Sequence, residues 1–140
     1  MMPVITLTAN PDATARSVIE QGLNGYNAQH VARDSRGLAV LVSDPETQDV
    51  PGGILGRTSL GICFIDAVFL PETLRGRDLG RRMMDEAEDE ARRRGCRAIV
   101  LYTISFQAPG FYEKLGYRTF GTIDCLPPGI TRHFMVKDLD

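Results

Sequence analysis

The segment from Leu70 to Gly80, LPETLRGRDLG, joins a short apolar stretch to an amphipathic one through a turn rich in arginine and glycine. The residues from Ile62 to Leu70, ICFIDAVFL, are dense in β-branched and aromatic side chains and end at Pro71, which predicts a strand. From Leu79 onward apolar residues recur every four positions until Gly95, which predicts a helix that ends at this glycine. The turn therefore lies at a helix entrance, where unpaired N–H groups and the helix dipole attract anions.

Arginine side chains crowd this helix entrance, at Arg75, Arg77, Arg81 and Arg82. The helix dipole disfavours cations there, by up to about 1 kcal/mol for each exposed charge. A bound polyanion would reverse the sign of this penalty, because guanidinium groups and free backbone N–H groups would all donate to it. The arginines therefore favour a polyanionic ligand such as a pyrophosphate, and a solvated arginine-rich turn is the alternative.

Later in the same helix, acidic residues precede basic residues by four positions, which is typical of ion pairs on a solvent-exposed helix face. These expected surface pairs are Glu88 with Arg92, Asp89 with Arg93, and Glu90 with Arg94.

Two motifs lie at a defined separation, the loop from Arg75 to Gly80 and the block from Ser105 to Tyr117, SFQAPGFYEKLGY. The loop resembles the acetyl-CoA loop of the GNAT N-acetyltransferase superfamily. The pattern of that loop is Arg or Gln, two residues, Gly, one residue, and then Gly or Ala, and Arg75 and Gly80 match its two ends. The block is similar to a second segment of that superfamily, with Ala108, Tyr112 and Gly116 in register. The resemblance implies an α/β fold over a single domain, residues 1–140, with a mixed central sheet whose parallel strands splay apart between flanking helices.

Acetyl-CoA is the co-substrate that the resemblance implies, entering the gap between the parallel strands that start at Ile62 and Ala98. Backbone groups near Val68 and Phe69 would then bind the pantetheine arm and the acetyl carbonyl, and the arginine loop would surround the pyrophosphate. The resemblance implies these cofactor-binding residues: Val68, Phe69, Arg75, Gly76, Arg77, Asp78, Leu79, Gly80, Arg81, Ser105, Ala108 and Tyr112.

Two of these residues depart from the family pattern. Asp78 stands where the family usually has its first loop glycine, and a carboxylate there would repel a pyrophosphate unless it turns outward or pairs with an arginine. Aspartate tolerates a left-handed backbone better than most residues do. Ser105 stands where many members have Asn, so a polar contact to the pantetheine arm is expected to be shorter or absent.

The implied reaction is direct transfer of acetyl from acetyl-CoA to a primary amine of an unidentified small-molecule or peptide acceptor. Tyr112 matches the tyrosine that protonates the departing thiolate in the family. The amine must lose a proton, and Asp66 is the candidate base because burial in its apolar strand would raise its pKa. A structural or water-facing carboxylate is the alternative for Asp66, and Glu72 and His133 are further candidates for the base.

Two other functional classes are open at this stage. A catalytically silent acetyl-CoA-binding regulatory module agrees with the departure at Asp78. A nucleotide-binding domain of another fold would need an acidic residue at the end of the next strand, and the strand from Ala98 to Thr103 ends in Tyr-Thr.

The composition limits the binding partners and the cellular location that we expect for this protein. A net charge of -2 predicts no bulk attraction to nucleic acid or to a membrane. The 3 cysteines lack Cys-x-x-Cys spacing and only 2 histidines could join them, which disfavours a metal site. We find no signal peptide or membrane-length apolar run and expect a cytoplasmic protein, with a homodimer implied only by the resemblance.

The remaining predicted elements comprise a first strand, a helix that glycines break in two, five more strands and a short second helix. The Ala98 strand is expected to be buried on both faces because its apolar run is nearly continuous. The predicted ranges are strands at 4–8, 37–43, 52–58, 98–103, 118–123 and 132–136, and helices at 13–31 and 109–115.

Overall fold

The computed structural model describes residues 2–140, which divide into two compact units, residues 2–33 and residues 34–140. The first unit contains helix α1 (Ala13–Ala28), which begins where the Asp12 carboxylate accepts a hydrogen bond of 2.7 Å from the Ala15 N–H. The helix continues through Gly22 and Gly25, so the predicted break is wrong. Glycine costs a helix about 1 kcal/mol but still contributes its backbone hydrogen bond.

Residues 4–8 form no strand, although the structure describes all of them, so the predicted first strand is wrong. A strand needs a neighbour to pair its backbone groups. The described part of the first unit, residues 2–33, offers no second strand for that pairing.

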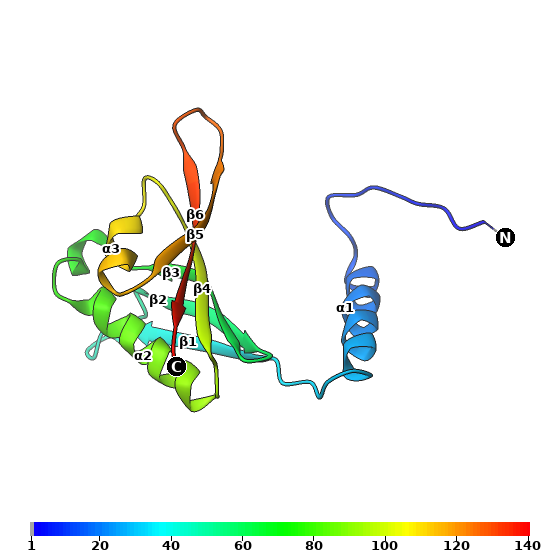
Figure 1. The fold of residues 1–140 in the computed structure, drawn as a ribbon, viewed down its shortest axis with the longest axis horizontal. Coiled ribbons are helices and arrows are strands. Elements are labelled where there is room, and N and C mark those ends of the chain that lie inside the picture. Colours follow the sequence, from blue (N-terminus) through cyan, green and yellow to red (C-terminus); the bar gives the residue numbers. More distant parts are fainter. Residues whose placement is uncertain (1) are drawn as a thin grey trace. The chain divides into compact units, whose positions relative to one another are not determined.

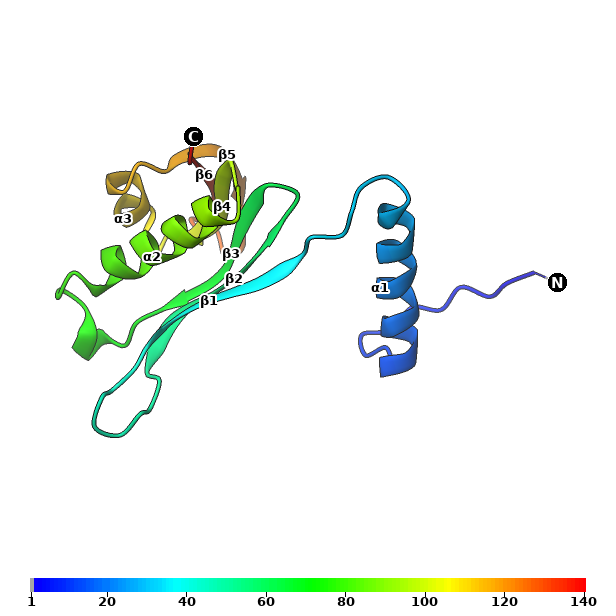
Figure 2. The ribbon, with the colours of Figure 1, turned by 90° about the horizontal axis from the view of Figure 1, so that it is seen from below.

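The second unit is an α/β fold around a six-stranded mixed sheet with the order β1-β2-β3-β4-β6-β5 (Figure 1). Its elements are β1 (Arg36–Val42), β2 (Gly52–Ser59), β3 (Ile62–Phe69), η1 (Glu72–Leu74), α2 (Leu79–Arg93), β4 (Ala98–Ile104), α3 (Pro109–Lys114), β5 (Arg118–Asp124) and β6 (Thr131–Asp138). The predicted strands and helices of this unit are therefore confirmed to within a few residues. Figure 2 shows α2 lying along the sheet.

Strands β3 and β4 are parallel neighbours that pair over only a short seam. The paired residues are Ile62 with Ala98, Cys63 with Ile99, and Phe64 with Val100. Beyond Phe64, β3 continues to Phe69 while staying paired with β2, and β4 continues while staying paired with β6. The two strands therefore splay apart, as the family resemblance implies, and leave a gap inside the sheet.

Helix α2 packs on one face of the sheet through the residues Met83, Met84, Ala87, Glu88 and Ala91, all of which are buried. The helix ends as predicted: Gly95 has a φ of 80°, and the Cys96 N–H donates to the carbonyl of Ala91 at 2.9 Å.

The prediction that β4 is buried on both faces is wrong. Its residues Ile99, Leu101 and Thr103 are buried, whereas Tyr102 on the opposite face is 51% exposed. An apolar run in a strand therefore does not by itself show how many layers cover the sheet.

No helix within residues 2–140 has the length and apolar character needed to cross a membrane.

Candidate active site

A cavity of about 910 Å³ lies in the second unit where β3 and β4 separate. Its walls come from the second half of β3, the loop before α2, the first turns of α2, the end of β4 and the segment leading into α3. The predicted site residues that line it are Asp66, Val68, Phe69, Arg75, Gly76, Asp78, Gly80, Arg81, Ala108 and Tyr112. The splay therefore brings together residues that are up to 46 positions apart in the sequence.

Three predicted residues lie outside this lining in the part of the chain that the structure describes, namely Arg77, Leu79 and Ser105. Leu79 lines a smaller neighbouring hollow between α2 and β1. The hydroxyl of Ser105 accepts a hydrogen bond of 3.1 Å from the Thr131 N–H at the start of β6. Prediction from the sequence also missed Gln107 and Phe111 as cavity residues, although both lie within the block from Ser105 to Tyr117.

The loop before α2 is held by its own side chains. The Arg75 Nε donates to the carbonyl of Leu70 at 2.9 Å, which leaves the two Nη groups of this guanidinium as further donors. A Cβ on Gly80 would lie 3.1 Å from a ring carbon of Phe111, so glycine allows the first turn of α2 to approach the ring closely. The glycine at this position therefore serves packing as well as access to the helix N-terminus.

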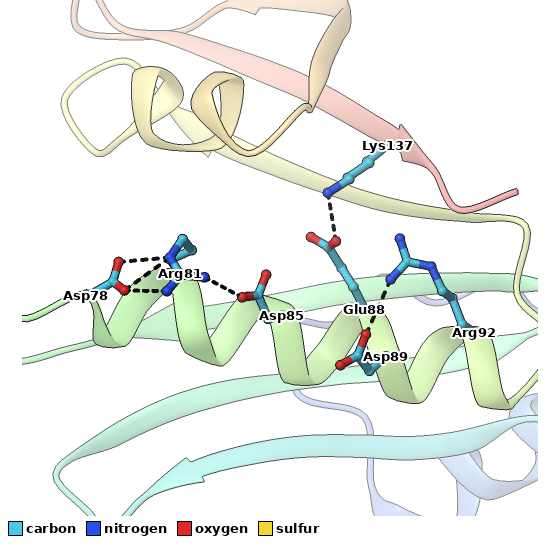
Figure 3. A network of polar contacts seen from close by, with 7 residues as sticks. All are labelled: Asp78, Arg81, Asp85, Glu88, Asp89, Arg92 and Lys137. Atoms are coloured by element: carbon cyan, nitrogen blue, oxygen red, sulfur yellow. Dashed lines mark hydrogen bonds and ion pairs between the residues drawn. The ribbon is translucent and has the colours of Figure 1, made fainter.

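Asp78 adopts the left-handed backbone conformation, with a φ of 64°, at the residue that precedes α2. Its carboxylate accepts hydrogen bonds from the Arg81 Nε at 2.9 and 3.1 Å and from Arg81 Nη2, and Arg81 Nη1 also donates to Asp85 at 2.7 Å (Figure 3). The bonds from Arg81 hold the pKa of Asp78 below its usual range. We call Asp78, Arg81 and Asp85 the exposed cluster, since about half of each side chain is in water.

A second group of polar side chains lies at the edge of the core, where Glu88 and Tyr117 are buried and Lys137 is partly buried. Glu88 is 4% exposed and accepts a hydrogen bond of 3.0 Å from the Tyr117 hydroxyl. It also accepts a hydrogen bond of 2.7 Å from the Lys137 Nζ (Figure 3). We call Glu88, Tyr117 and Lys137 the buried cluster. Burial and the neighbouring Glu88 charge together raise the pKa of Tyr117 far above its usual value.

The predicted surface pairs on α2 are only partly correct. Glu90 pairs with Arg94 at 2.8 Å as expected, but Glu88 faces Lys137 in the core, and Asp89 pairs with Arg92 at 3.4 Å instead of Arg93. Glu88 lies four residues after the fully buried Met84, so the apolar stripe of the helix contained the signal for its burial.

Tyr112 connects the cavity to the buried cluster. Its ring is 8% exposed and makes edge contacts with Phe111 and Tyr117, with centroid distances of 5.1 and 5.8 Å. The Tyr117 N–H also donates to the carbonyl of Tyr112 at 3.0 Å. Burial raises the pKa of Tyr112, so its hydroxyl keeps its proton at neutral pH and is able to donate it.

Asp66 lines the cavity but is not buried, which corrects the expectation from its apolar strand. The register between β2 and β3 shifts at this point, with Leu55 opposite Ala67 and Gly56 opposite Ile65, so Asp66 is the extra residue of a β-bulge. Its side chain is 52% exposed and lies 3.6 Å from the Nε of Arg57. The bulge interrupts the alternation of the strand and directs the carboxylate toward water.

The comparisons with known proteins agree with this geometry. The sequence pattern of the acetyltransferase (GNAT) family matches residues 11–117. A blasticidin-S acetyltransferase from Streptomyces morookaense is 39% identical over 95 residues, covering 67% of this chain and 70% of that protein. A crystal structure of a candidate acetyltransferase from Agrobacterium tumefaciens has a TM-score of 0.90 at 28% identity, covering 97% of this chain and 99% of the other.

A third comparison concerns the fold alone, because its sequence identity is low. The structure of a candidate streptothricin acetyltransferase from Bacillus anthracis, in complex with acetyl coenzyme A, has a TM-score of 0.59 at 19% identity. It covers 67% of this chain and 58% of the other. Taken with the family match, these similarities show that the chain belongs to the GNAT family of acetyltransferases.

Among residues 2–140, no group of three or more histidine, cysteine, aspartate or glutamate side chains is placed so that it could hold a metal ion.

Proposed function

We propose that this chain transfers the acetyl group of acetyl-CoA directly to a primary amine of a small molecule or peptide. The observation that carries the proposal is the cavity between β3 and β4, which joins an arginine-rich helix entrance to a buried tyrosine. The helix entrance is suited to bind a pyrophosphate, and the tyrosine is suited to protonate the thiolate that leaves the thioester.

The binding half of the proposal assigns the two ends of acetyl-CoA to two kinds of groups. Arg75 and Arg81, together with the N–H groups around Gly76 to Gly80, would hold the pyrophosphate, with Arg77 and Leu79 as flanking residues of the loop. The edge of β3 near Val68 and Phe69, which β4 does not cover, would pair with the pantetheine arm. Ala108, which also lines the cavity, would border the thioester.

The proposed acetyl transfer requires two proton transfers, one from the amine and one to the departing sulfur. The amine nitrogen attacks the acetyl carbonyl carbon, the carbon–sulfur bond breaks, and the surplus proton of the amine passes to water or to Asp66. The Tyr112 hydroxyl donates its proton to the departing sulfur, and solvent then restores the tyrosine. The exposure of Asp66 favours a role in attracting and orienting the cationic amine before transfer.

One relative supports a small-molecule acceptor. The similarity to a blasticidin-S acetyltransferase supports an amine-bearing compound of that size, and the family match supports acetyl-CoA as the donor. A peptide amine would need the same cavity chemistry, so the acceptor screen below includes both classes.

The test is a thiol-release assay with acetyl-CoA against panels of small amines and peptides, carried out on the wild type and on Tyr112→Phe. Phenylalanine keeps the ring in the core but removes the proton donor, so kcat should fall roughly ten- to a thousandfold while acetyl-CoA affinity changes little. Tyr102→Phe is the matched control, since it removes a hydroxyl from another tyrosine of the cavity wall.

Three outcomes would count against the proposal. Full activity of Tyr112→Phe would mean that water protonates the thiolate. Normal turnover with a lower melting temperature would make Tyr112 a packing residue. Acetyl-CoA binding by calorimetry, without thiol release from any amine, would favour the regulatory module instead.

A further inference from the structure

The segment between β4 and α3 contains two polar side chains, Ser105 and Gln107, that face different surroundings. Ser105 accepts its hydrogen bond from Thr131 on β6 and lies outside the lining of the cavity. Gln107 lines the cavity. The polar side chain that this segment presents to a bound ligand is therefore two residues beyond the position that the family pattern indicates.

The orientation of the Gln107 amide follows from its partners. Its Oε1 accepts from the Ile104 N–H at 3.0 Å and from the Thr103 hydroxyl at 3.3 Å. A backbone N–H can only donate, so the atom facing Ile104 must be the amide oxygen and not the amide nitrogen. The Nε2 group, with two N–H donors, is consequently directed away from these partners.

The anchor of this amide is rigid. Thr103 is 2% exposed, and its hydroxyl also accepts from the Ala108 N–H at 3.4 Å, one residue before α3. Gln107 is thus tied to a buried side chain of β4 and to the entrance of α3. A donor held in this way loses little conformational freedom when it binds an acceptor.

We propose that Gln107 binds the pantetheine arm of acetyl-CoA by donating from Nε2 to one of its carbonyl oxygens, in the role that the family pattern gives to the position of Ser105. The inference rests on the proposed function. The chemistry selects this part of the ligand, because the pantetheine arm carries amide carbonyl acceptors. An ammonium group of an acceptor substrate is itself a donor and does not complement Nε2.

The test compares the affinities of two ligands, coenzyme A and 3′-phospho-ADP, which lacks the pantetheine arm. Gln107→Glu keeps the size of the side chain and an oxygen for Ile104 and Thr103, but replaces the donor by a charged acceptor. We expect the Kd for coenzyme A to rise at least about tenfold, as for a polar group left without its partner, and the Kd for 3′-phospho-ADP to stay within twofold.

Two further variants separate the contact from charge and folding effects. Gln48→Glu adds the same charge in the β1–β2 loop and should leave both affinities unchanged. Gln107→Met removes the donor without adding charge and should weaken coenzyme A binding severalfold, with the folded state of each variant checked by its melting temperature.

The outcomes distinguish the inference from the proposed function. A wild-type protein that binds no coenzyme A overturns both. A wild-type protein that binds it, with Gln107→Glu equally tight or with both ligands weakened alike, overturns the Gln107 contact alone. Ser105→Ala weakening coenzyme A as much as Gln107→Glu would return the contact to Ser105.

Discussion

Helix α2 contributes to two clusters of polar side chains that lie in different environments, and Figure 3 shows the exposed cluster together with the Glu88–Lys137 pair of the buried cluster. In the exposed cluster, Arg81 lies between two carboxylates near the start of the helix, and each side chain is about half in water. In the buried cluster, the Glu88 side chain is 5% exposed, and its carboxylate accepts hydrogen bonds from the Lys137 Nζ and the Tyr117 hydroxyl. Pairs of a carboxylate with a cation therefore occur both at the cavity rim and at the edge of the core, where the lysine remains partly exposed.

The difference in solvent exposure determines whether the ion pairs of each cluster can exchange partners. Exposed ion pairs contribute little to stability and exchange partners with solvent, so Arg81 is able to release Asp78 in favour of a phosphate. A buried carboxylate cannot lose its partners without a large penalty. The buried cluster therefore maintains the position of Tyr117, against which Tyr112 packs, while the exposed cluster remains adjustable.

The largest effect is expected from breaking the buried cluster. Glu88→Ala removes the acceptor of the partly buried Lys137 ammonium and of the buried Tyr117 hydroxyl, and we expect the free energy of unfolding to fall by about 3 kcal/mol. Urea denaturation measures the change. The double variant Glu88→Met, Lys137→Met should recover most of the loss, because it removes both charges. A loss below about 1 kcal/mol for Glu88→Ala would mean that the pair is effectively solvated.

The second effect is a loss of stability at alkaline pH, and it tests the burial of a thiol next to the buried cluster. Burial raises the pKa of the fully buried Cys63 thiol, which interacts electrostatically with Tyr117, from 9.0 to about 11. The unfolded chain therefore releases this proton first, so the stability contribution is complete below pH 9 and is lost as the pH rises to 11. The loss amounts to about 2 to 3 kcal/mol.

Cys63→Ala removes this part of the pH dependence, and Cys125→Ala, at a less buried thiol, should leave it unchanged. Unfolding curves between pH 8 and 11 make the comparison. Equal slopes in the wild type and in Cys63→Ala would show that the thiol ionises as readily in the folded protein as in the unfolded chain.

The smallest effect is expected at the exposed cluster. Asp78→Gly removes a negative charge from the cavity rim, releases Arg81 and suits the left-handed backbone, so acetyl-CoA should bind roughly fivefold more tightly in dilute salt. The gain should shrink in 0.5 M salt because of screening. Calorimetry checks both expectations, with unfolding curves to confirm that stability is unaffected.

Asp85→Ala is the matched control, because it takes the other carboxylate from Arg81 but lies outside the cavity lining among the described residues. It should change acetyl-CoA affinity less than twofold. If Asp78→Gly binds no more tightly than the wild type, the carboxylate of Asp78 does not act on the ligand.

Prediction from the sequence succeeded where a local pattern determines the structure. The helix entrance at Leu79, its end at Gly95 and the strands from Gly37 onward all follow from periodicity and from glycine and proline positions. The splay of β3 and β4 came from the family resemblance, since no local pattern indicates where two distant strands stop pairing.

The wrong predictions concern burial and strand pairing, which depend on contacts between residues far apart in the sequence. The β-bulge at Asp66 depends on the register with β2, which an apolar run cannot show. Burial of Glu88 depends on Lys137, 49 residues later, and its acid-before-base spacing suggested a surface pair instead. Residues 4–8 alternate like a strand, but pairing with a neighbour is what makes a strand.

The short seam between β3 and β4 gives the sheet a mechanical property. Hydrogen-bonded pairing between the two halves, β1-β2-β3 and β4-β6-β5, is confined to three consecutive residue pairs at one end. A rotation of one half against the other about Cys63 and Ile99 would therefore produce larger displacements at the open ends of the strands. Both side chains are fully buried, so we expect a change in their volume to alter the angle between the two halves and the width of the cavity.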